Sequence, residues 1–116
     1  MYRPGLHIIS EFEVKNPSEL SHCEKIKKHI DHCIEKYSLQ KVGEVYYEFP
    51  SGGYTAVVCL TESHISIHTW PEFNKVTFDV FLSNYLKYND DSVEEMHDGI
   101  LKLMEATKVN STRIKR

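Results

Sequence analysis

The sequence predicts an α+β domain, a two-layer sandwich in which a mainly antiparallel sheet carries two helices on one face. The chain has 116 residues, which is the length of a single domain, 1–116. Six β-rich runs and two helical patterns can be recognised, and four of the β-rich runs follow one another without a helix between them. This order disfavours a doubly wound parallel sheet, in which strands and helices alternate.

The first part of the chain predicts a strand followed by a helix. His7 to Val14 is a β-rich run, and Asn16-Pro17-Ser18 marks a turn and a helix start. From Leu20 onward the apolar residues recur at steps of three and four, which places them in one stripe of an amphipathic helix. These residues are Leu20, Cys23, Ile26, Ile30, Cys33, Ile34 and Tyr37.

The rest of the chain predicts four strands, a second helix and a last strand. The four strands are Val42–Phe49, Tyr54–Leu60, His64–Trp70 and Lys75–Leu82, with turn or break signals at residues 50–53 and 71–74. Asp91 or Ser92 caps a second helix, and a short strand follows at Val109–Ile114. The apolar stripe of this helix is formed by Val93, Met96, Ile100, Leu101 and Met104.

Composition limits the classes of function. The net charge of -3 gives no electrostatic basis for binding nucleic acid or an anionic membrane. No window approaches the roughly 20 apolar residues of a membrane span, and no apolar signal segment follows the N-terminus, so we expect a cytoplasmic protein. The three cysteines form neither a disulfide framework nor a CxxC zinc pair, and we expect Cys23 and Cys33 to be buried.

The predicted sandwich leaves one face of its sheet uncovered. A large exposed apolar sheet face is rare in a monomer, and a chain of this length builds only a small core. A second copy of the chain is the most economical cover. We therefore expect a homodimer.

The segment from Thr61 to Glu72, T-E-S-H-I-S-I-H-T-W-P-E, has the most unusual pattern. As a strand it places the odd-numbered residues 63–69 on one face and the even-numbered residues 64–70 on the other. A half-buried strand with a polar outer face is one interpretation. A zinc site shared by His64 and His68 is disfavoured, because four strand residues separate them by about 13 Å. A Ser-His hydrolase is disfavoured because no GxSxG motif is present.

This segment closely resembles the processing-site motif of the prokaryotic S-adenosylmethionine decarboxylases. The resemblance includes Glu62-Ser63-His64, the alternating Ile65 and Ile67, and the run from His68 to Glu72. It continues outside the motif and covers nearly the whole chain, so it implies the S-adenosylmethionine decarboxylase-like sandwich. The outer matches are Gly5, His7, Glu11 and Phe12 in the opening strand, Phe49 before a Gly-bearing turn, and Asp79-Val80-Phe81 after the motif.

The resemblance implies a proenzyme that cuts itself between Glu62 and Ser63 into residues 1–62 and 63–116. The Ser63 hydroxyl would attack the Glu62 carbonyl and convert the amide into an ester. His68, which is similar to the family's processing base, would then remove the α-proton of residue 63, and the resulting dehydroalanine would hydrolyse to a pyruvoyl group. Thr55 occupies the place of a family Ser that assists processing, and it keeps a hydroxyl.

The resemblance also implies the reaction. In such enzymes the pyruvoyl group forms a Schiff base with the substrate amine and accepts the electrons released with CO2. The expected function is therefore decarboxylation in polyamine and spermidine biosynthesis, with S-adenosylmethionine as the first-choice substrate. Phe49 and Tyr54 are candidates to stack on its adenine, and Glu72 is a candidate to hydrogen-bond its ribose. Core packing is an equally good interpretation of each aromatic residue.

Ser83 departs from the family pattern, which has a catalytic Cys at this place to protonate the substrate carbon. An aliphatic hydroxyl is a far weaker acid than a thiol with a pKa of about 8.5. Three explanations stay open. A water or a histidine delivers the proton, the substrate is ornithine or arginine, or the chain is an unprocessed, non-catalytic homologue that binds an active relative.

Overall fold

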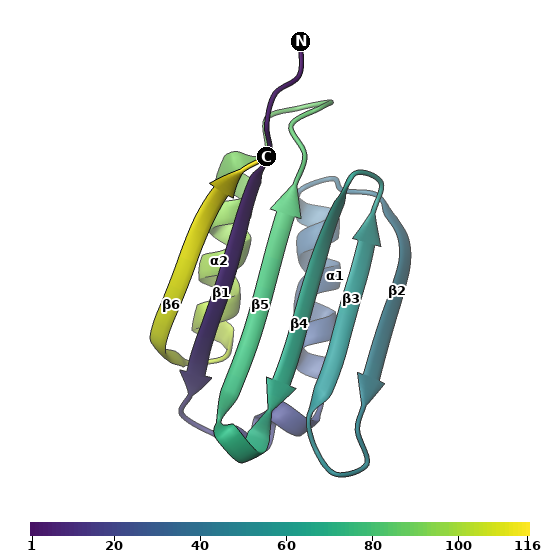
Figure 1. Ribbon diagram of the computed structural model, residues 1–116. Coiled ribbons are helices and arrows are strands. Elements are labelled where there is room, and N and C mark those ends of the chain that lie inside the picture. Colours follow the sequence, from purple (N-terminus) through teal and green to yellow (C-terminus); the bar gives the residue numbers. More distant parts are fainter.

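The computed structural model describes all 116 residues, which form one six-stranded sheet with two α-helices on one face (Figure 1). The α+β two-layer sandwich predicted from the sequence is therefore confirmed. The strands are β1 (Leu6–Val14), β2 (Lys41–Glu48), β3 (Tyr54–Leu60), β4 (Ser63–Trp70), β5 (Lys75–Leu82) and β6 (Ala106–Lys115). The helices are α1 (Glu24–Lys36) and α2 (Asp90–Leu103), and two 3-10 helices are η1 (Pro17–Ser21) and η2 (Pro71–Phe73).

The order of the strands across the sheet is β2-β3-β4-β5-β1-β6, and every neighbouring pair is antiparallel. β2 to β5 are consecutive hairpin partners, whereas β1 from the start of the chain lies between β5 and β6 (Figure 1). The first and last strands of the chain are therefore neighbours, and both lie on the side of the sheet away from β2.

Three boundaries differ from the sequence prediction by two residues or more. The first helix begins at Glu24 rather than Leu20, because Pro17–Ser21 forms a separate 3-10 helix. The second helix begins at Asp90, and Asn89 is its N-cap residue. The last strand begins at Ala106 rather than Val109, because pairing with β1 extends it past a register shift between Glu11 and Glu13.

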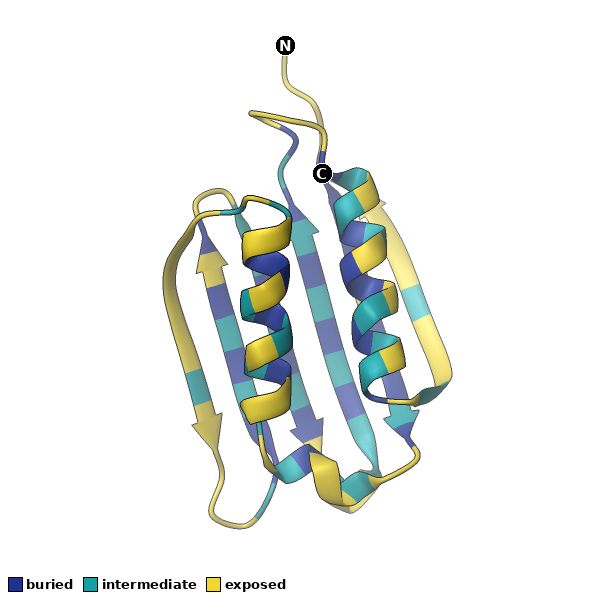
Figure 2. Ribbon diagram, turned by 180° about the vertical axis from the view of Figure 1, so that it is seen from behind, coloured by how far each residue is buried: buried dark blue, intermediate teal, exposed yellow.

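The core lies between the sheet and the helices. Alternate residues of the inner strands are buried, and Figure 2 shows the helices covering the face toward which these residues point. The buried residues of α1 are Ile26, Ile30, Cys33 and Ile34. Those of α2 are Val93, Met96, His97 and Ile100. Cys33 is buried as expected, and Cys23 is partly buried against the core. We call the other side of the sheet, which no element covers, the open face.

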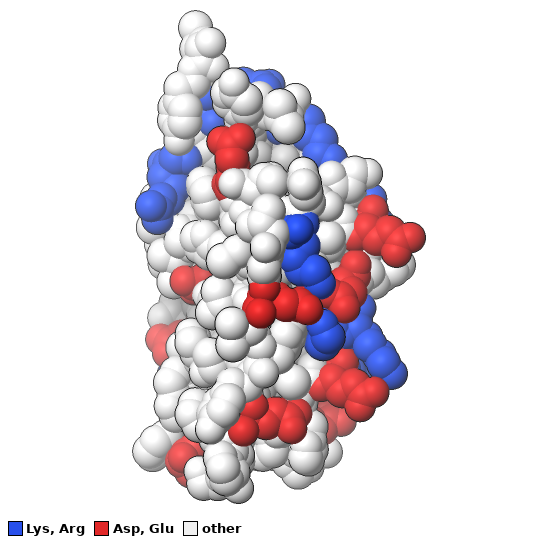
Figure 3. Space-filling view, turned by 90° about the vertical axis from the view of Figure 1, so that its right-hand side faces the viewer, with Lys and Arg blue, Asp and Glu red and all other residues white.

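The β2 edge of the sheet is protected by charge. The side of the molecule drawn in Figure 3 carries interspersed basic and acidic side chains. Lys27 of α1 and Lys41 of β2 both form ion pairs with Glu44 of β2, with N–O distances of 2.9 and 2.7 Å. Charged side chains on an edge strand oppose its pairing with another strand. Self-association through this edge is therefore disfavoured.

None of the helices combines the length and the apolar character that crossing a membrane requires.

Candidate active site

Ser63 lies at the tip of a β-hairpin. It is the first residue of β4 and pairs with Leu60, so the two-residue turn Thr61-Glu62 connects β3 to β4. Glu62 is exposed and Ser63 is partly buried. The peptide bond between them therefore joins an accessible turn to a fixed strand.

The structure brings Ser63 and Ser83 together. β4 and β5 pair up to His64 opposite Phe81, and Ser83 follows the last residue of β5. The backbone N–H of Ser83 donates a hydrogen bond to Ser63 Oγ, with an N–O distance of 3.0 Å. At this end of β5 the ladder of backbone bonds is thus continued by a bond to a side chain.

A cavity of about 150 Å³ adjoins this contact. Its lining includes Glu62, Ser63, Ser83, Lys87 and Asn89, and Glu62 and Lys87 are its only charged residues. Cavities that bind drug-sized ligands usually measure about 300–1,000 Å³. The Ser63 cavity is therefore too small to hold a drug-sized molecule whole.

Thr55 and His68 form a second polar pair, on the open face. They are directly opposite each other on β3 and β4, and Thr55 Oγ1 is hydrogen-bonded to His68 Nδ1 at 3.0 Å. Both residues are partly buried. A hydrogen bond to one ring nitrogen fixes the orientation of an imidazole and the role of its other nitrogen. The arrangement can therefore present His68 Nε2 as a proton acceptor above the sheet.

The two pairs lie far apart within one chain. Ser63 and His68 are five residues apart on β4, which corresponds to about 17 Å along a strand. Ser63 shares its face of the strand with the buried Ile65 and Ile67, whereas His68 lies on the open face. One chain therefore does not bring His68 to the α-carbon of residue 63.

The predicted substrate contacts Phe49 and Glu72 lie at the His68 end of the sheet. Phe49 follows β2, is 44% exposed, and meets the ring of Tyr47 edge to face with centroids 5.0 Å apart. Glu72 is exposed on η2, directly after β4. Both side chains are accessible to a ligand.

Tyr54 lies elsewhere. It is 1% exposed and belongs to the core, because the alternation of β3 directs residues 54, 56, 58 and 60 toward the helices. Burial raises the pKa of its phenol, whose oxygen has no hydrogen-bond partner. Its ring offers no face to an adenine, so core packing is the interpretation that the structure supports for this residue.

Two features of the site were missed from the sequence. Tyr47 lies opposite Thr55, so the strand register aligns Tyr47, Thr55 and His68 across the open face. On the same face, His7 Nε2 is 3.8 Å from Asp79 Oδ2, and the His7 ring meets His64 edge-on at 5.5 Å. Burial lowers the pKa of His7. Only the strand pairing shows these groupings, because β1 lies beside β5.

No group of three or more His, Cys, Asp and Glu side chains is arranged to hold a metal ion.

Comparisons with known proteins show which family the chain resembles. The family model described as S-adenosylmethionine decarboxylase matches residues 6–116. The S-adenosylmethionine decarboxylase proenzyme of Thermoplasma volcanium is 33% identical over 112 residues, covering 97% of this chain and 83% of that protein. That of Archaeoglobus fulgidus is 39% identical over 77 residues, covering 66% of this chain and 69% of that protein.

A solved structure is also similar. The crystal structure of the adenosylmethionine decarboxylase from Aquifex aeolicus superposes with a TM-score of 0.83 and 27% sequence identity, covering 100% of this chain and 92% of that chain. The fold, the matched residues and the similarity over nearly the full length define the class. The chain belongs to the S-adenosylmethionine decarboxylase family. The resemblance noted in the sequence is thereby confirmed.

Proposed function

We propose that the chain is the proenzyme of a pyruvoyl-dependent decarboxylase that acts on S-adenosylmethionine in polyamine biosynthesis. Family membership supports this proposal, since the similar curated proteins carry the name of that proenzyme. The observation that carries it is the Ser63 hydroxyl, held by the Ser83 N–H beside an accessible Glu62–Ser63 peptide bond. A nucleophile fixed next to an exposed bond is what self-cleavage requires.

The surroundings of Ser63 fit a pyruvoyl group formed from this residue. Ser63 is the first residue of β4, so cleavage in front of it leaves the pairing of β4 with β3 and β5 in place. The new N-terminus stays in the Ser63 cavity. A pyruvoyl group there supplies an electrophilic carbonyl that takes up the electron pair released with CO2. The chain is thereby divided into residues 1–62 and 63–116.

The first step of cleavage uses groups that are already in contact. Ser63 Oγ bonds to the carbonyl carbon of Glu62, the bond from that carbon to the nitrogen of residue 63 breaks, and the hydroxyl proton passes to this nitrogen. An ester replaces the amide. A base then takes the α-proton of residue 63, Glu62 leaves as a carboxylate, and hydrolysis of the resulting dehydroalanine releases ammonia.

The base of the second step comes from another copy of the chain. His68, the predicted base, is about 17 Å along β4 from residue 63. Two copies that pack open face against open face, with their two-fold axis across the strands, bring the His68 end of each copy over the Ser63 end of the other. A symmetric homodimer thus assembles two identical sites, each from Ser63 and Ser83 of one copy and Thr55, His68, Phe49 and Glu72 of the other.

The open face has the character of such an interface. It presents apolar side chains with between 39% and 61% exposure, among them Ile9, Val45, Tyr47 and Ile114. Partial exposure of several apolar side chains on one sheet face is typical of a protein interaction surface.

Ser83 supports one alternative substrate class. It lines the Ser63 cavity, yet its hydroxyl is poorly matched to proton transfer at neutral pH. Ornithine or arginine is the second candidate, because a changed proton donor fits a changed substrate. Ser83→Cys tests whether position 83 can supply the proton. If S-adenosylmethionine is the substrate, turnover on it rises or inactivation slows; unchanged rates show that position 83 is not the proton donor.

Denaturing mass spectrometry tests the proposed function. Purified protein gives two fragments divided in front of residue 63, while Ser63→Ala stays at the intact mass. CO2 release is then measured in parallel with S-adenosylmethionine, ornithine and arginine, with Ser63→Ala as the blank. An intact wild-type chain after prolonged incubation would contradict the enzyme and favour an unprocessed partner of an active relative.

A further inference from the structure

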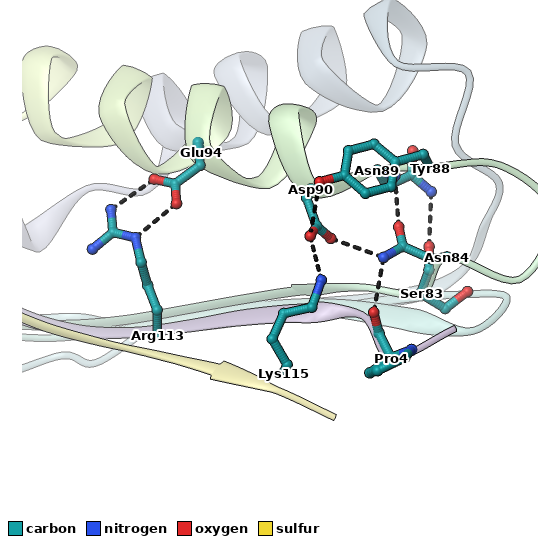
Figure 4. A network of polar contacts seen from close by, with 9 residues as sticks. All are labelled: Pro4, Ser83, Asn84, Tyr88, Asn89, Asp90, Glu94, Arg113 and Lys115. Atoms are coloured by element: carbon teal, nitrogen blue, oxygen red, sulfur yellow. Dashed lines mark hydrogen bonds and ion pairs between the residues drawn. The ribbon is translucent and has the colours of Figure 1, made fainter. Parts of the chain in front are cut away.

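The loop from Ser83 to Asn89, between β5 and α2, is held closed by two buried asparagines. The side chains of Asn84 and Asn89 point into the loop (Figure 4). Asn84 is 2% exposed and Asn89 is 8% exposed. Buried amides of this kind are retained only where their hydrogen bonds are made. We call this pair the asparagine clasp.

The clasp joins the two ends of the loop reciprocally. The backbone N–H of Asn89 donates to Asn84 Oδ1 at 2.6 Å, and Asn89 Nδ2 donates to the carbonyl oxygen of Ser83 at 2.8 Å. Asn89 Nδ2 also reaches the carbonyl oxygen of Lys87 at 3.4 Å. The Ser83 carbonyl is therefore fixed by a side chain six residues further along the chain.

The clasp is anchored to the rest of the fold. Asn84 Nδ2 donates to the carbonyl oxygen of Pro4 at 2.9 Å and to Asp90 Oδ1 at 2.8 Å (Figure 4). Asp90 in turn contacts Lys115 at the end of β6. The loop is thus tied to the N-terminal segment, to the start of α2 and to the last strand. The loop that carries Ser83 is consequently hydrogen-bonded to three separate parts of the fold.

The backbone of Ser83 also contacts the proposed nucleophile, the hydroxyl of Ser63. The Ser83 N–H donates to Ser63 Oγ, while the Ser83 carbonyl accepts from Asn89. The side chain of Ser83 takes no part in either bond. Asn89 lines the Ser63 cavity, and its carboxamide is separated from Ser63 Oγ by the backbone of a single residue.

We propose that Asn89 is a positioning residue for self-cleavage, which acts by aiming the backbone N–H of Ser83 at Ser63 Oγ. This inference rests on the proposed function. A hydrogen bond from the Ser83 N–H to Ser63 Oγ fixes the rotamer from which the hydroxyl attacks. It also stabilises the negative charge that grows on this oxygen as its proton leaves, since a charged acceptor strengthens the bond.

The backbone and the side chain of residue 83 thereby have two separable roles. Its backbone serves cleavage, and its side chain is free to serve turnover. Replacing the side chain at this position therefore leaves the nucleophile held in the same way. A chain with Ser at the place of the family's Cys therefore retains the contact that serves self-cleavage.

The experiment compares cleavage rates of the full chain after refolding from denaturant. Asn89→Ala is expected to slow cleavage by about 10-fold. The variant misdirects the Ser83 N–H without removing it, so the loss stays below the roughly 10²–10³-fold cost of deleting a donor to a developing oxyanion. Tyr85→Ala is the matched control, because it removes a side chain that is 70% exposed and contributes only backbone atoms to the loop's hydrogen bonds.

Hydroxylamine identifies the affected step, because it cuts esters and leaves amides intact. Asn89→Ala is expected to lower hydroxylamine-dependent cleavage by the same factor as spontaneous cleavage, which places the defect before the ester. The folded fraction is measured by circular dichroism. A purely structural role lowers the amount of chain that cleaves and leaves the rate of the folded fraction unchanged, and this result overturns the inference.

Failure of the inference and failure of the function give different results. Wild-type cleavage together with an unchanged rate in Asn89→Ala overturns the inference alone. An intact wild-type chain overturns the proposed function and this inference together.

Discussion

The two ends of β4 are built on different principles. At the Ser63 end the backbone does the positioning: a strand-end N–H holds the hydroxyl, and a buried pair of asparagines holds the loop. At the His68 end, a side chain positions another side chain, because Thr55 holds the imidazole across the strands on the open face. In the proposed mechanism, the groups of the Ser63 end come from one chain, whereas the His68 end acts on the Ser63 end of another copy.

The largest expected effect tests this division directly. Ser63→Ala and His68→Ala chains are each expected to stay uncleaved when refolded alone, with rates reduced by about 10²-fold or more. Refolded together, they form mixed dimers in which one site has both Ser63 and His68. The His68→Ala chain is then cut and the Ser63→Ala chain is not, which mass spectrometry distinguishes. If neither chain in the mixture is cut, the two ends do not meet across a dimer.

A smaller effect is expected at the Thr55–His68 pair. Thr55→Val keeps the shape of the side chain and removes the hydroxyl, so the imidazole loses its fixed orientation. We expect cleavage to slow by about 10-fold, since one hydrogen bond contributes roughly 1 kcal/mol. Thr55→Ser, the matched control, retains the hydroxyl and should cleave close to the wild-type rate. Equal rates in Thr55→Val and the wild type would show that His68 is positioned by other contacts.

Unlike the partly buried His68 on the open face, another histidine is fully buried between the helices and the sheet. His97 of α2 is 2% exposed, is bonded to Ser10, and stacks on Phe78. Burial, assisted by Arg113, lowers the pKa of His97 below its ordinary value of 6.5, although Asp98 and Glu94 act in the other direction. The unfolded chain therefore takes up a proton at a pH at which the folded chain does not.

Stability should consequently fall in acid. The free energy of unfolding is expected to decrease as the pH falls below about 6.5, by up to roughly 1.4 kcal/mol per pH unit for this group, until the folded protein is protonated as well. Urea unfolding of the Ser63→Ala chain at pH 7.5 and 5.5 measures the change. His97→Gln removes the titrating group and should show a weaker dependence on pH. The same dependence in both chains would assign the effect to other groups, including His7.

The smallest effect is expected at Tyr54. Its buried hydroxyl has no hydrogen-bond partner, so Tyr54→Phe removes an unsatisfied polar group and should change stability by only about 1 kcal/mol, in the stabilising direction. KM for the substrate should stay the same, because the ring belongs to the core. Phe49→Ala is the comparison variant and should raise KM. A raised KM in Tyr54→Phe would show that this residue contacts the substrate.

Much of the fold could be predicted from local patterns. The alternation in His64–Trp70 and the apolar stripe of the first helix reflect which side chains are buried, and burial is a local property of strands and helices. The start of α1 could not be predicted in this way, because Pro17 is compatible with the first turn of either an α-helix or a 3-10 helix. Packing of Leu20 into the core decided between them.

The candidate site could be predicted only in part. The motif around Ser63 named the cleavage bond and the residues expected to act on it. The distance between Ser63 and His68 was also present in the strand spacing, because five residues reverse the face and span about 17 Å. The motif alone did not show which groups contact these two residues. Asn84 and Asn89 gave no signal, because asparagines near a helix start are common caps.

The sequence by itself determined the family and the α+β class and predicted the residues that carry the chemistry, because these depend on residue types at fixed spacings. The tertiary structure alone decided which groups meet: the Ser83 N–H with Ser63 Oγ, and Asn89 with Ser83. Such contacts depend on strand pairing and loop closure between residues distant in the chain. These are set by the packing of the whole molecule and not by any local pattern.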